Sequence, residues 1–240
     1  MAPAGPCLLV AGGTGLVGAA VIRERLADRG WQGCIIAPVR RTPAFADPRL
    51  VPVVAPLTEA GDDDRVVAVM RERCGGARLD TYVSCLGTTL EVAGSREAFI
   101  AVDRELVLRL ARVSFGLGAR KAVLVSSVGA SRQSGNFYLR IKGEVEDAMA
   151  EAGFKRLDIL QPGLLLGPRN EVRHGEALAQ KLAPVYNPLL RGAKLRRYRA
   201  IPAETVARAI VRLTEQSAPG KFVHQHDEIE ALADGVDLKS

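Results

Sequence analysis

Short apolar runs alternate with helical segments six times between residues 7 and 163. The predicted strands cover residues 7–13, 34–40, 51–55, 79–87, 121–127 and 156–163. In most of the segments between them, apolar residues recur every three or four positions, which is the spacing of a helix buried on one face. Strands that alternate with helices favour a parallel sheet with helices on both faces. The pattern therefore predicts a doubly wound α/β fold.

A glycine-rich loop, AGGTGLVG, follows the first predicted strand and opens the first predicted helix. Its glycines Gly12, Gly15 and Gly18 are spaced three and three. In a dinucleotide-binding loop the first glycine allows a tight turn, the second lets backbone approach a pyrophosphate, and the third lets helix and strand pack closely. The alternative is a glycine-rich turn without a ligand. In this position the loop favours a Rossmann-type dinucleotide site.

The end of the second predicted strand bears on which dinucleotide binds. An Asp or Glu there would accept a hydrogen bond from the ribose 2′-hydroxyl of NAD. This chain has Arg40 and Arg41 instead, and guanidinium groups can bind a phosphate bidentately. We therefore expect NADP (NADPH) rather than NAD as cofactor, with two unliganded surface arginines as the alternative.

The length and the distribution of the motifs predict one domain. Its 240 residues, 48% of them hydrophobic, are enough to bury a single core. We expect residues 1–163 to form the dinucleotide-binding core, and the segment 164–202, rich in Pro and Arg, to form a small substrate lobe. Residues 203–240 would complete the core with a helix and a last strand.

Composition excludes several classes of protein. No apolar stretch reaches the roughly 20 residues needed to cross a bilayer, and no basic segment precedes the short apolar run near the start. We therefore expect a cytoplasmic protein that does not bind membranes. The net charge of +6 suits an anionic ligand. The basic residues are spread along the chain except for RGAKLRRYR at residues 191–199, which we interpret as a solvated loop, with an anion site as the alternative. Because no recognition module surrounds that cluster, nucleic acid is not expected.

Cysteines and histidines indicate neither a metal site nor a hydrolase. Cys7, Cys34, Cys74 and Cys85 lack C-x-x-C spacing and nearby histidines, so we interpret them as reduced packing residues. The three histidines are His174, His224 and His226, and none lies in a hydrolase-like motif with Ser or Cys. We expect them to be surface or loop residues.

Tyr138 and Lys142 are the candidate catalytic pair. They stand four residues apart in a segment predicted to be helical, so both side chains would lie on one helix face. A cation beside a phenol favours its ionised form, which proton exchange near neutral pH requires. Ser126 and Ser127 end the fifth predicted strand, at the carboxyl edge where open α/β sheets bind ligands. The alternative for the pair alone is a solvated helix face.

Several motifs in order resemble the short-chain dehydrogenase/reductase superfamily. They are the glycine loop, the serines that end the fifth strand and the Y-x-x-x-K pair. The segments CLGTT, VDRELVL, NFYLRIKGEVE and QPGLLLGPR resemble more closely the Tat-interacting-protein group of its atypical members. The likeness runs from about residue 10 to residue 169, and weakly through IPAETVARAI.

The resemblance implies a role for each matching residue. Tyr138 would be the general acid/base, Lys142 would bind the nicotinamide ribose and favour ionisation of the tyrosine, and Ser127 would hydrogen-bond the substrate oxygen, with Ser126 as its rival. Where many relatives carry an asparagine this chain has Asp103, which leaves the proton relay behind Lys142 open. The implied cofactor-binding residues are Gly12, Thr14, Gly15, Leu16, Val17, Gly18, Arg40, Arg41, Leu86, Gly87, Thr88, Lys142, Pro162 and Gly163.

These features favour an NADP-dependent oxidoreductase that transfers a hydride between nicotinamide and a small carbonyl or alcohol substrate. The alternative from another class is an NADP(H)-binding regulatory protein with little turnover, since the group it resembles is associated with protein partners. A nucleotide-sugar epimerase is the third hypothesis, and it is disfavoured because residues 164–202 make a short lobe for so large a substrate.

Overall fold

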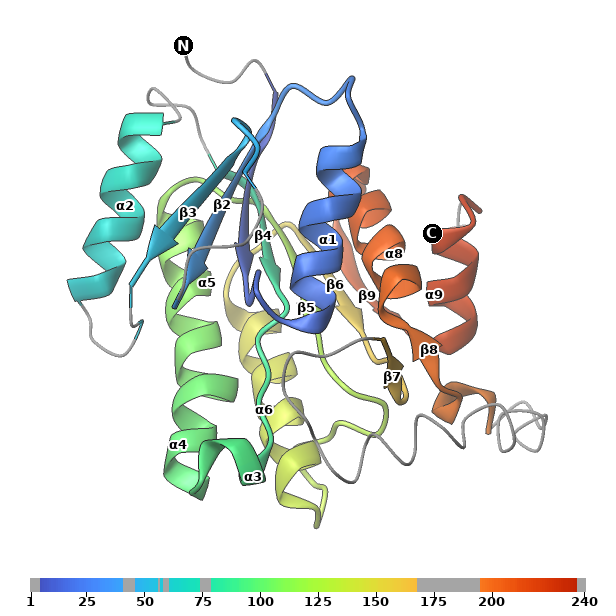
Figure 1. Cartoon of the computed structure of the whole chain (residues 1–240). Coiled ribbons are helices and arrows are strands. Elements are labelled where there is room, and N and C mark those ends of the chain that lie inside the picture. Colours follow the sequence, from blue (N-terminus) through green and yellow to red (C-terminus); the bar gives the residue numbers. More distant parts are fainter. Residues whose placement is uncertain are drawn as a thin grey trace.

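The protein is built around one sheet of seven parallel strands (Figure 1). The computed structural model describes residues 5–40, 46–55, 57, 61–73, 79–167 and 195–236. The strands are β1 (Cys7–Ala11), β2 (Cys34–Val39), β3 (Leu50–Val54), β4 (Leu79–Ser84), β5 (Lys121–Val125), β6 (Arg156–Leu160) and β9 (Gly220–His224). They are ordered β3-β2-β1-β4-β5-β6-β9. The predicted doubly wound fold is confirmed.

Helices cover both faces of the sheet (Figure 1). One layer contains α1 (Leu16–Ala27), α8 (Ala203–Glu215) and α9 (His226–Ala233), and the other contains α2 (Gly61–Arg73), α5 (Val107–Gly116) and α6 (Phe137–Glu151). Along β1, Leu8 and Val10 belong to the apolar core under the first layer, whereas Leu9 and Ala11 belong to the core under the second. This alternation follows from the two-residue period of a strand.

The strand order reverses at β1, which has β2 on one side and β4 on the other. In an open α/β sheet, ligands bind outside the carboxyl ends of the strands at such a switch point. The glycine loop after β1 and the segment after β4 both start at this edge, which is the lower edge of the sheet in Figure 1. The fold therefore brings the two motifs together.

Two of the three cysteines in the described part of the chain lie in the sheet interior, and the third, Cys85, is half-buried just after β4 and packs against the core. Cys7 and Cys34 are opposite each other on β1 and β2, and both are buried. Their Sγ atoms lie 2.9 Å apart as a hydrogen-bonded pair of thiols. Their interpretation as packing residues is confirmed, while Cys74 lies outside the described residues.

The helical region between β4 and β5 is not a regular α-helix. After the short helices α3 (Leu90–Ala93) and α4 (Arg96–Ile100), the chain forms a π-helical segment, η1 (Ala101–Leu106), that continues into α5. A π-helical turn widens the helix and is often found at functional sites. Here it carries the fully buried Asp103.

Residues 168–194, most of the predicted lobe, lie outside the described residues. At the two ends of that segment, β7 (Leu165–Leu166) pairs in parallel with β8 (Ile201–Pro202), and the 3₁₀ helix η3 (Arg196–Tyr198) precedes β8. Among the helices that the structure describes, none has the length and apolarity to span a membrane.

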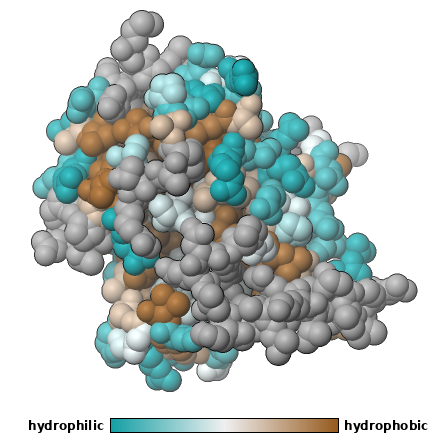
Figure 2. Space-filling model, in the orientation of Figure 1, coloured by the Kyte–Doolittle hydropathy of each residue, from teal (hydrophilic) through white to brown (hydrophobic). Residues whose placement is uncertain are grey.

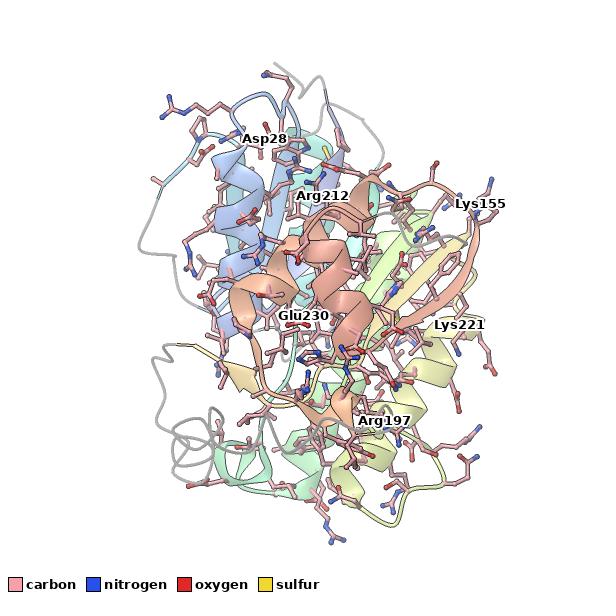
Figure 3. The ribbon with its side chains drawn as sticks, turned by 90° about the vertical axis from the view of Figure 1, so that its right-hand side faces the viewer. Asp28, Lys155, Arg197, Arg212, Lys221 and Glu230 are labelled. Atoms are coloured by element: carbon pink, nitrogen blue, oxygen red, sulfur yellow. The ribbon has the colours of Figure 1, made fainter. Side chains whose placement is uncertain are left out.

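Helix α9 was not predicted. It begins with a capping box in which the Gln225 side chain accepts from the backbone of Glu228, and the Glu228 side chain accepts from the backbone N–H of Gln225. Figure 3 views the side of the molecule that carries α8 and α9, with Arg212 and Glu230 labelled.

The space-filling view shows apolar residues at the surface over the β2–β3 end of the sheet, where Val54 is exposed (Figure 2).

Candidate active site

Two glycines of the loop after β1 are required by packing. Gly12 has a φ of +79°, and a Cβ built on it would lie 2.7 Å from the carbonyl oxygen of Cys85, just after β4. A Cβ on Gly18 would lie 2.2 Å from the carbonyl oxygen of Gly12. The loop therefore packs against the β4 exit on one side and against its own helix on the other.

Gly15 differs, because its free side faces outward. It is the N-cap of α1 with extended backbone angles, and an added Cβ would meet only the Gly12 carbonyl oxygen, at 3.2 Å. The first amides of a helix have no intrahelical partner and attract anions, and the first turn of α1 holds no acidic side chain. The exposed backbone of this loop fits the pyrophosphate of a dinucleotide.

The other predicted loop residues divide by exposure. Thr14 is exposed and Leu16 is half-buried, so both side chains reach the loop surface. Val17 is 5% exposed and belongs to the apolar core. Any contact between Val17 and a ligand is therefore limited to its backbone. Arg40 follows β2 directly and is exposed, whereas Arg41 lies outside the described residues.

Lys142 is held in a buried ion pair at the centre of the candidate site. Its Nζ lies 2.9 Å from Oδ1 of Asp103, with side chains that are 5% and 0% exposed. It also donates to the carbonyl oxygen of Leu86 at 3.4 Å. The other oxygen of Asp103, Oδ2, accepts from the backbone N–H of Thr88 at 2.8 Å. Lys142 on α6 is thus joined to the segment 86–88 after β4.

Electrostatics keep the lysine protonated. Burial of the Lys142 ammonium acts to lower its pKa, but the neighbouring acidic groups of Asp103, Tyr138 and Glu146 together outweigh burial. The pKa of Lys142 therefore lies above its ordinary value of 10.5. The sequence left open what Asp103 does behind Lys142, and the structure shows that it contacts the Lys142 ammonium directly.

Tyr138 sits one turn before Lys142 on α6, a helix capped by the side chain of Asn136. Its half-buried ring packs edge-on against Phe99 with centroids 5.9 Å apart. Nζ of Lys142 lies 6.0 Å from the centre of the same ring. No described residue hydrogen-bonds the Tyr138 hydroxyl. The pair therefore lies on one helix face, with the phenol oxygen open to another partner.

The adjacent serines differ in their contacts. Ser126 is 6% exposed, and its hydroxyl donates to Oε1 of Glu146 in a short hydrogen bond. Ser127 is half-buried, and its hydroxyl has no hydrogen-bond partner within the described part of the chain. The hydroxyl of Ser126 is therefore hydrogen-bonded inside the protein, whereas that of Ser127 is available to a ligand.

Two further neighbours of the site are Glu146, which the sequence did not single out for a role, and Gln161, which the resemblance had placed with Pro162 and Gly163 near the nicotinamide carboxamide. Gln161 Nε2 lies 3.0 Å from each carboxylate oxygen of Glu146, and both residues are 8% exposed. The signal for Glu146 was present, because Tyr138, Lys142 and Glu146 follow one another at intervals of four on the same helix. No local pattern indicated the hydrogen bonds between Gln161 and Glu146, because the two residues come from different elements.

The segment after β6 lies against the end of the lobe. Pro162 is buried and its carbonyl oxygen accepts from the N–H of Val128 at 3.0 Å. A Cβ on Gly163 would lie 2.3 Å from the carbonyl oxygen of Arg199. The β5 exit, the β6 exit and the chain returning from the lobe therefore converge here.

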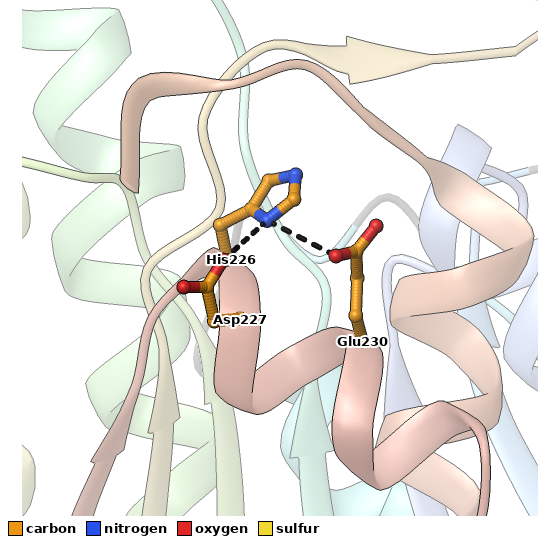
Figure 4. Close-up of side chains that lie close together, drawn as sticks. All are labelled: His226, Asp227 and Glu230. Atoms are coloured by element: carbon orange, nitrogen blue, oxygen red, sulfur yellow. Dashed lines mark hydrogen bonds and ion pairs between the residues drawn. The ribbon is translucent and has the colours of Figure 1, made fainter. Parts of the chain in front are cut away.

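The prediction that the histidines are surface or loop residues is wrong for the two described ones. His224 is 6% exposed, and its Nε2 lies 2.9 Å from Oδ1 of Asp158. His226 is 3% exposed, and its Nδ1 lies 3.2 Å from Asp227 and 3.4 Å from Glu230 (Figure 4). A single histidine gives no local sign of its burial. His174 lies outside the described residues.

The group in Figure 4 is the one set of described side chains that could also hold a metal ion. Asp227 is in addition paired with Arg196 of η3 at 3.1 Å. The contacts of His226 with the two carboxylates and this ion pair account for the arrangement.

Solved structures identify the fold. A short-chain dehydrogenase/reductase from Saccharomyces cerevisiae superposes with a TM-score of 0.68 over 97% of this chain and 100% of that chain, at 15% identity. ElxO with NADPH bound gives 0.66 over 96% and 99%, at 13% identity. WbmH of Bordetella bronchiseptica in complex with NAD⁺ gives 0.64 over 95% and 79%, at 13% identity. The fold is the Rossmann-type fold of short-chain dehydrogenases/reductases.

Sequence comparison identifies the family. No family model matches the chain. The mitochondrial protein FMP52 of Lodderomyces elongisporus is 33% identical over 227 residues, which cover 90% of this chain and 89% of that protein. Rat HTATIP2 is 44% identical over 102 residues, 42% of each chain. The chain belongs to the FMP52 and HTATIP2 family of atypical short-chain dehydrogenases/reductases.

These relatives contradict the expectation of a cytoplasmic protein, because the fungal FMP52 proteins are named as mitochondrial. The expectation relied on apolar runs and on a basic segment before them. Mitochondrial transit peptides are amphipathic and rich in Arg and Ser, so those criteria do not detect them.

Proposed function

We propose that this protein is an NADP-dependent oxidoreductase that transfers a hydride between nicotinamide and a small carbonyl or alcohol substrate, with Tyr138 as general acid/base. The observation that carries the proposal is the buried ammonium of Lys142. It lies beside the Tyr138 ring and reaches the segment after β4. This segment in turn packs on the glycine loop through Cys85 and Gly12. A phenol with an open hydroxyl, a fixed cation and the glycine loop thus meet at one edge of the sheet.

Different residues of the chain would bind different parts of the cofactor. The loop from Gly12 to Gly18 would hold the pyrophosphate, and Arg40 with Arg41 would bind the 2′-phosphate. Lys142 and the segment 86–88 would contact the riboses, and Pro162 with Gly163 would lie at the carboxamide. When bound, the nicotinamide supplies or accepts the hydride.

Tyr138 would exchange the proton with the substrate oxygen. In the direction of reduction, the phenol donates its proton to the oxygen that becomes the alcohol, and the phenolate that remains is stabilised by the Lys142 ammonium. Ser127 would donate a second hydrogen bond to the same oxygen, since its hydroxyl is not used within the described protein. Asp103 fixes the position of the ammonium and favours its charged form.

Replacement of Tyr138 by Phe tests the proposal. The variant keeps the ring that packs on Phe99, so we expect it to fold and to bind NADPH as the wild type does. Loss of the general acid should reduce kcat by a factor of roughly 10² or more. Tyr82→Phe is the matched control, because it removes a phenol hydroxyl that bonds the Val107 carbonyl oxygen in the core. The control should lose stability and keep kcat.

Binding should be measured by calorimetry and turnover with a panel of carbonyl compounds. If the protein is instead a nucleotide-binding regulatory protein, Tyr138→Phe should change neither nucleotide binding nor the low turnover. Wild-type turnover by Tyr138→Phe on a substrate from the panel would show that the proposed proton donor is wrong.

A further inference from the structure

Four polar side chains form a continuous hydrogen-bonded chain beneath the candidate site. Ser126 donates to Glu146, and Gln161 donates to both Glu146 oxygens. Oε1 of Gln161 accepts from Nε2 of Gln225, the N-cap residue of α9, at 3.0 Å. The chain therefore crosses from the end of β5 through α6 to the end of β6 and the start of α9.

Glu146 is the centre of this chain, and only 8% of its surface is exposed. Burial raises the pKa of Glu146, while the bonds from Ser126 and Gln161 and the charge of Lys221 oppose that shift without cancelling it. The charged groups that face it are Lys142 and Asp147 on α6, and Lys221 on β9, which Figure 3 labels. Among described residues it forms no ion pair within 4.0 Å, so its role is to accept hydrogen bonds.

The two partners of Glu146 immediately precede residues of the proposed site. Ser126 comes before Ser127, and Gln161 comes before Pro162 and Gly163. Backbone bonds join the same two strand exits, from Ser126 N–H to the Leu160 carbonyl oxygen at 2.8 Å and from Val128 N–H to that of Pro162 at 3.0 Å. The Glu146 carboxylate adds the side-chain link between them.

We propose that Glu146 is a positioning residue, which sets the position of Ser127 relative to Pro162 and Gly163 by holding Ser126 and Gln161 together. This inference rests on the proposed function, which assigns Ser127 to the substrate oxygen and the segment 162–163 to the nicotinamide. Glu146 touches neither reactant in this scheme. Its removal should therefore disturb the nicotinamide half of the site and leave the adenosine half intact.

A carboxylate suits this position because it is a pure acceptor that faces donors from two strands. Alanine would leave Ser126 and Gln161 without their buried acceptor, which typically costs more than the bond itself contributes. Glutamine keeps one acceptor oxygen for Ser126. Because Ser126 and Gln161 both donate to the same Glu146 oxygen, Oε1, a glutamine carbonyl at that position keeps one bond to each partner, so Glu146→Gln should restore much of the arrangement.

Two nucleotides separate the halves of the site. NADPH reports on both halves, and adenosine 2′,5′-bisphosphate reports on the adenosine half alone. The full-length variants Glu146→Ala and Glu146→Gln are compared with Glu144→Ala, which removes a more exposed carboxylate from the same helix, paired with Arg104 at 2.8 Å. Dissociation constants are measured by calorimetry, and kcat and KM with the substrate found in the screen.

We expect Glu146→Ala to bind NADPH about tenfold more weakly, to bind the bisphosphate within about twofold of the wild type, and to lose kcat. Glu146→Gln should recover most of both losses, and Glu144→Ala should match the wild type. If Glu146→Ala does not fold, Ser126→Ala is used in its place, because it removes one of the bonds to Glu146. It should also weaken the binding of NADPH more than the binding of the bisphosphate.

Equal weakening of both nucleotides, or unchanged NADPH binding and kcat in Glu146→Ala, would overturn the inference while the proposed function stands. If the wild type binds the nucleotides but turns over no substrate, the proposed reaction is wrong. The comparison of dissociation constants then still tests the role of Glu146. If the wild type binds neither nucleotide, the proposed function is wrong, and the inference about Glu146 is overturned with it.

Discussion

Replacement of Asp103 by Asn isolates the charge on which Lys142 depends. Asp103 contacts two groups with two different oxygens: Oδ1 forms the ion pair with the Lys142 ammonium, and Oδ2 accepts from the Thr88 amide. Asparagine has one acceptor oxygen, so its NH₂ group must face one of these donors. The substitution therefore leaves the size of the side chain unchanged but breaks one contact and leaves the Lys142 ammonium without its counter-ion.

The magnitude follows from the burial of both groups. For charges 2.9 Å apart, the attraction is about 6 kcal/mol at an effective dielectric constant of ~20. Part of this offsets the desolvation of the pair, and removal of one partner from a buried pair typically costs roughly 3–5 kcal/mol. We expect Asp103→Asn to lower the free energy of unfolding by that amount at neutral pH.

The pH dependence has a definite sign. Because the pKa of folded Lys142 is raised above 10.5, the pair's contribution is fully present below the unfolded value. It is lost as pH rises through the folded value. Without Asp103, burial acts to lower the pKa of Lys142. The stability difference between wild type and variant should therefore be constant near neutral pH and shrink in strong alkali.

Urea unfolding followed by the fluorescence of Trp31, the single tryptophan, which is 8% exposed, measures this difference. The double variant Asp103→Asn with Lys142→Met completes the cycle, and it should be more stable than Asp103→Asn alone because the unpaired charge is gone. A loss below about 1 kcal/mol, or no recovery in the double variant, would refute the buried ion pair as a source of stability.

The glycine loop and the cofactor preference give two further predictions. Gly15→Val should abolish NADPH binding and leave the unfolding free energy nearly unchanged, since only the Gly12 carbonyl oxygen is near its Cβ. Gly18→Ala should destabilise the fold by roughly 1–3 kcal/mol, because its Cβ overlaps that same oxygen. Calorimetry and thermal melts on the two variants check both; NADPH binding by Gly15→Val would mean that the loop is only a turn. Arg40→Ala with Arg41→Ala should weaken NADPH at least tenfold, about 1.4 kcal/mol, and leave NADH unchanged, and equal affinities for the two nucleotides in the wild type would contradict the assignment.

The sequence by itself determined the fold class and the main motifs, because those signals are local. Apolar periodicity reports which face of each element is buried, so the order of strands and helices could be predicted. The loop glycines were identifiable because backbone that approaches backbone leaves no space for a Cβ, as the contacts of Gly12 and Gly18 show. Tyr138 and Lys142 share a helix face, and four-residue spacing alone reports that.

Only the tertiary structure decided which groups meet from distant parts of the chain. The π-helical segment η1 brings Asp103 to Lys142, and helical periodicity cannot reveal such a local shift in register. The different contacts of Ser126 and Ser127 depend on Glu146, twenty residues beyond Ser126. The buried histidines and helix α9 were missed for the same reason. Their environment is supplied by segments remote in sequence, and contacts of that kind follow from the packed fold and leave no local pattern.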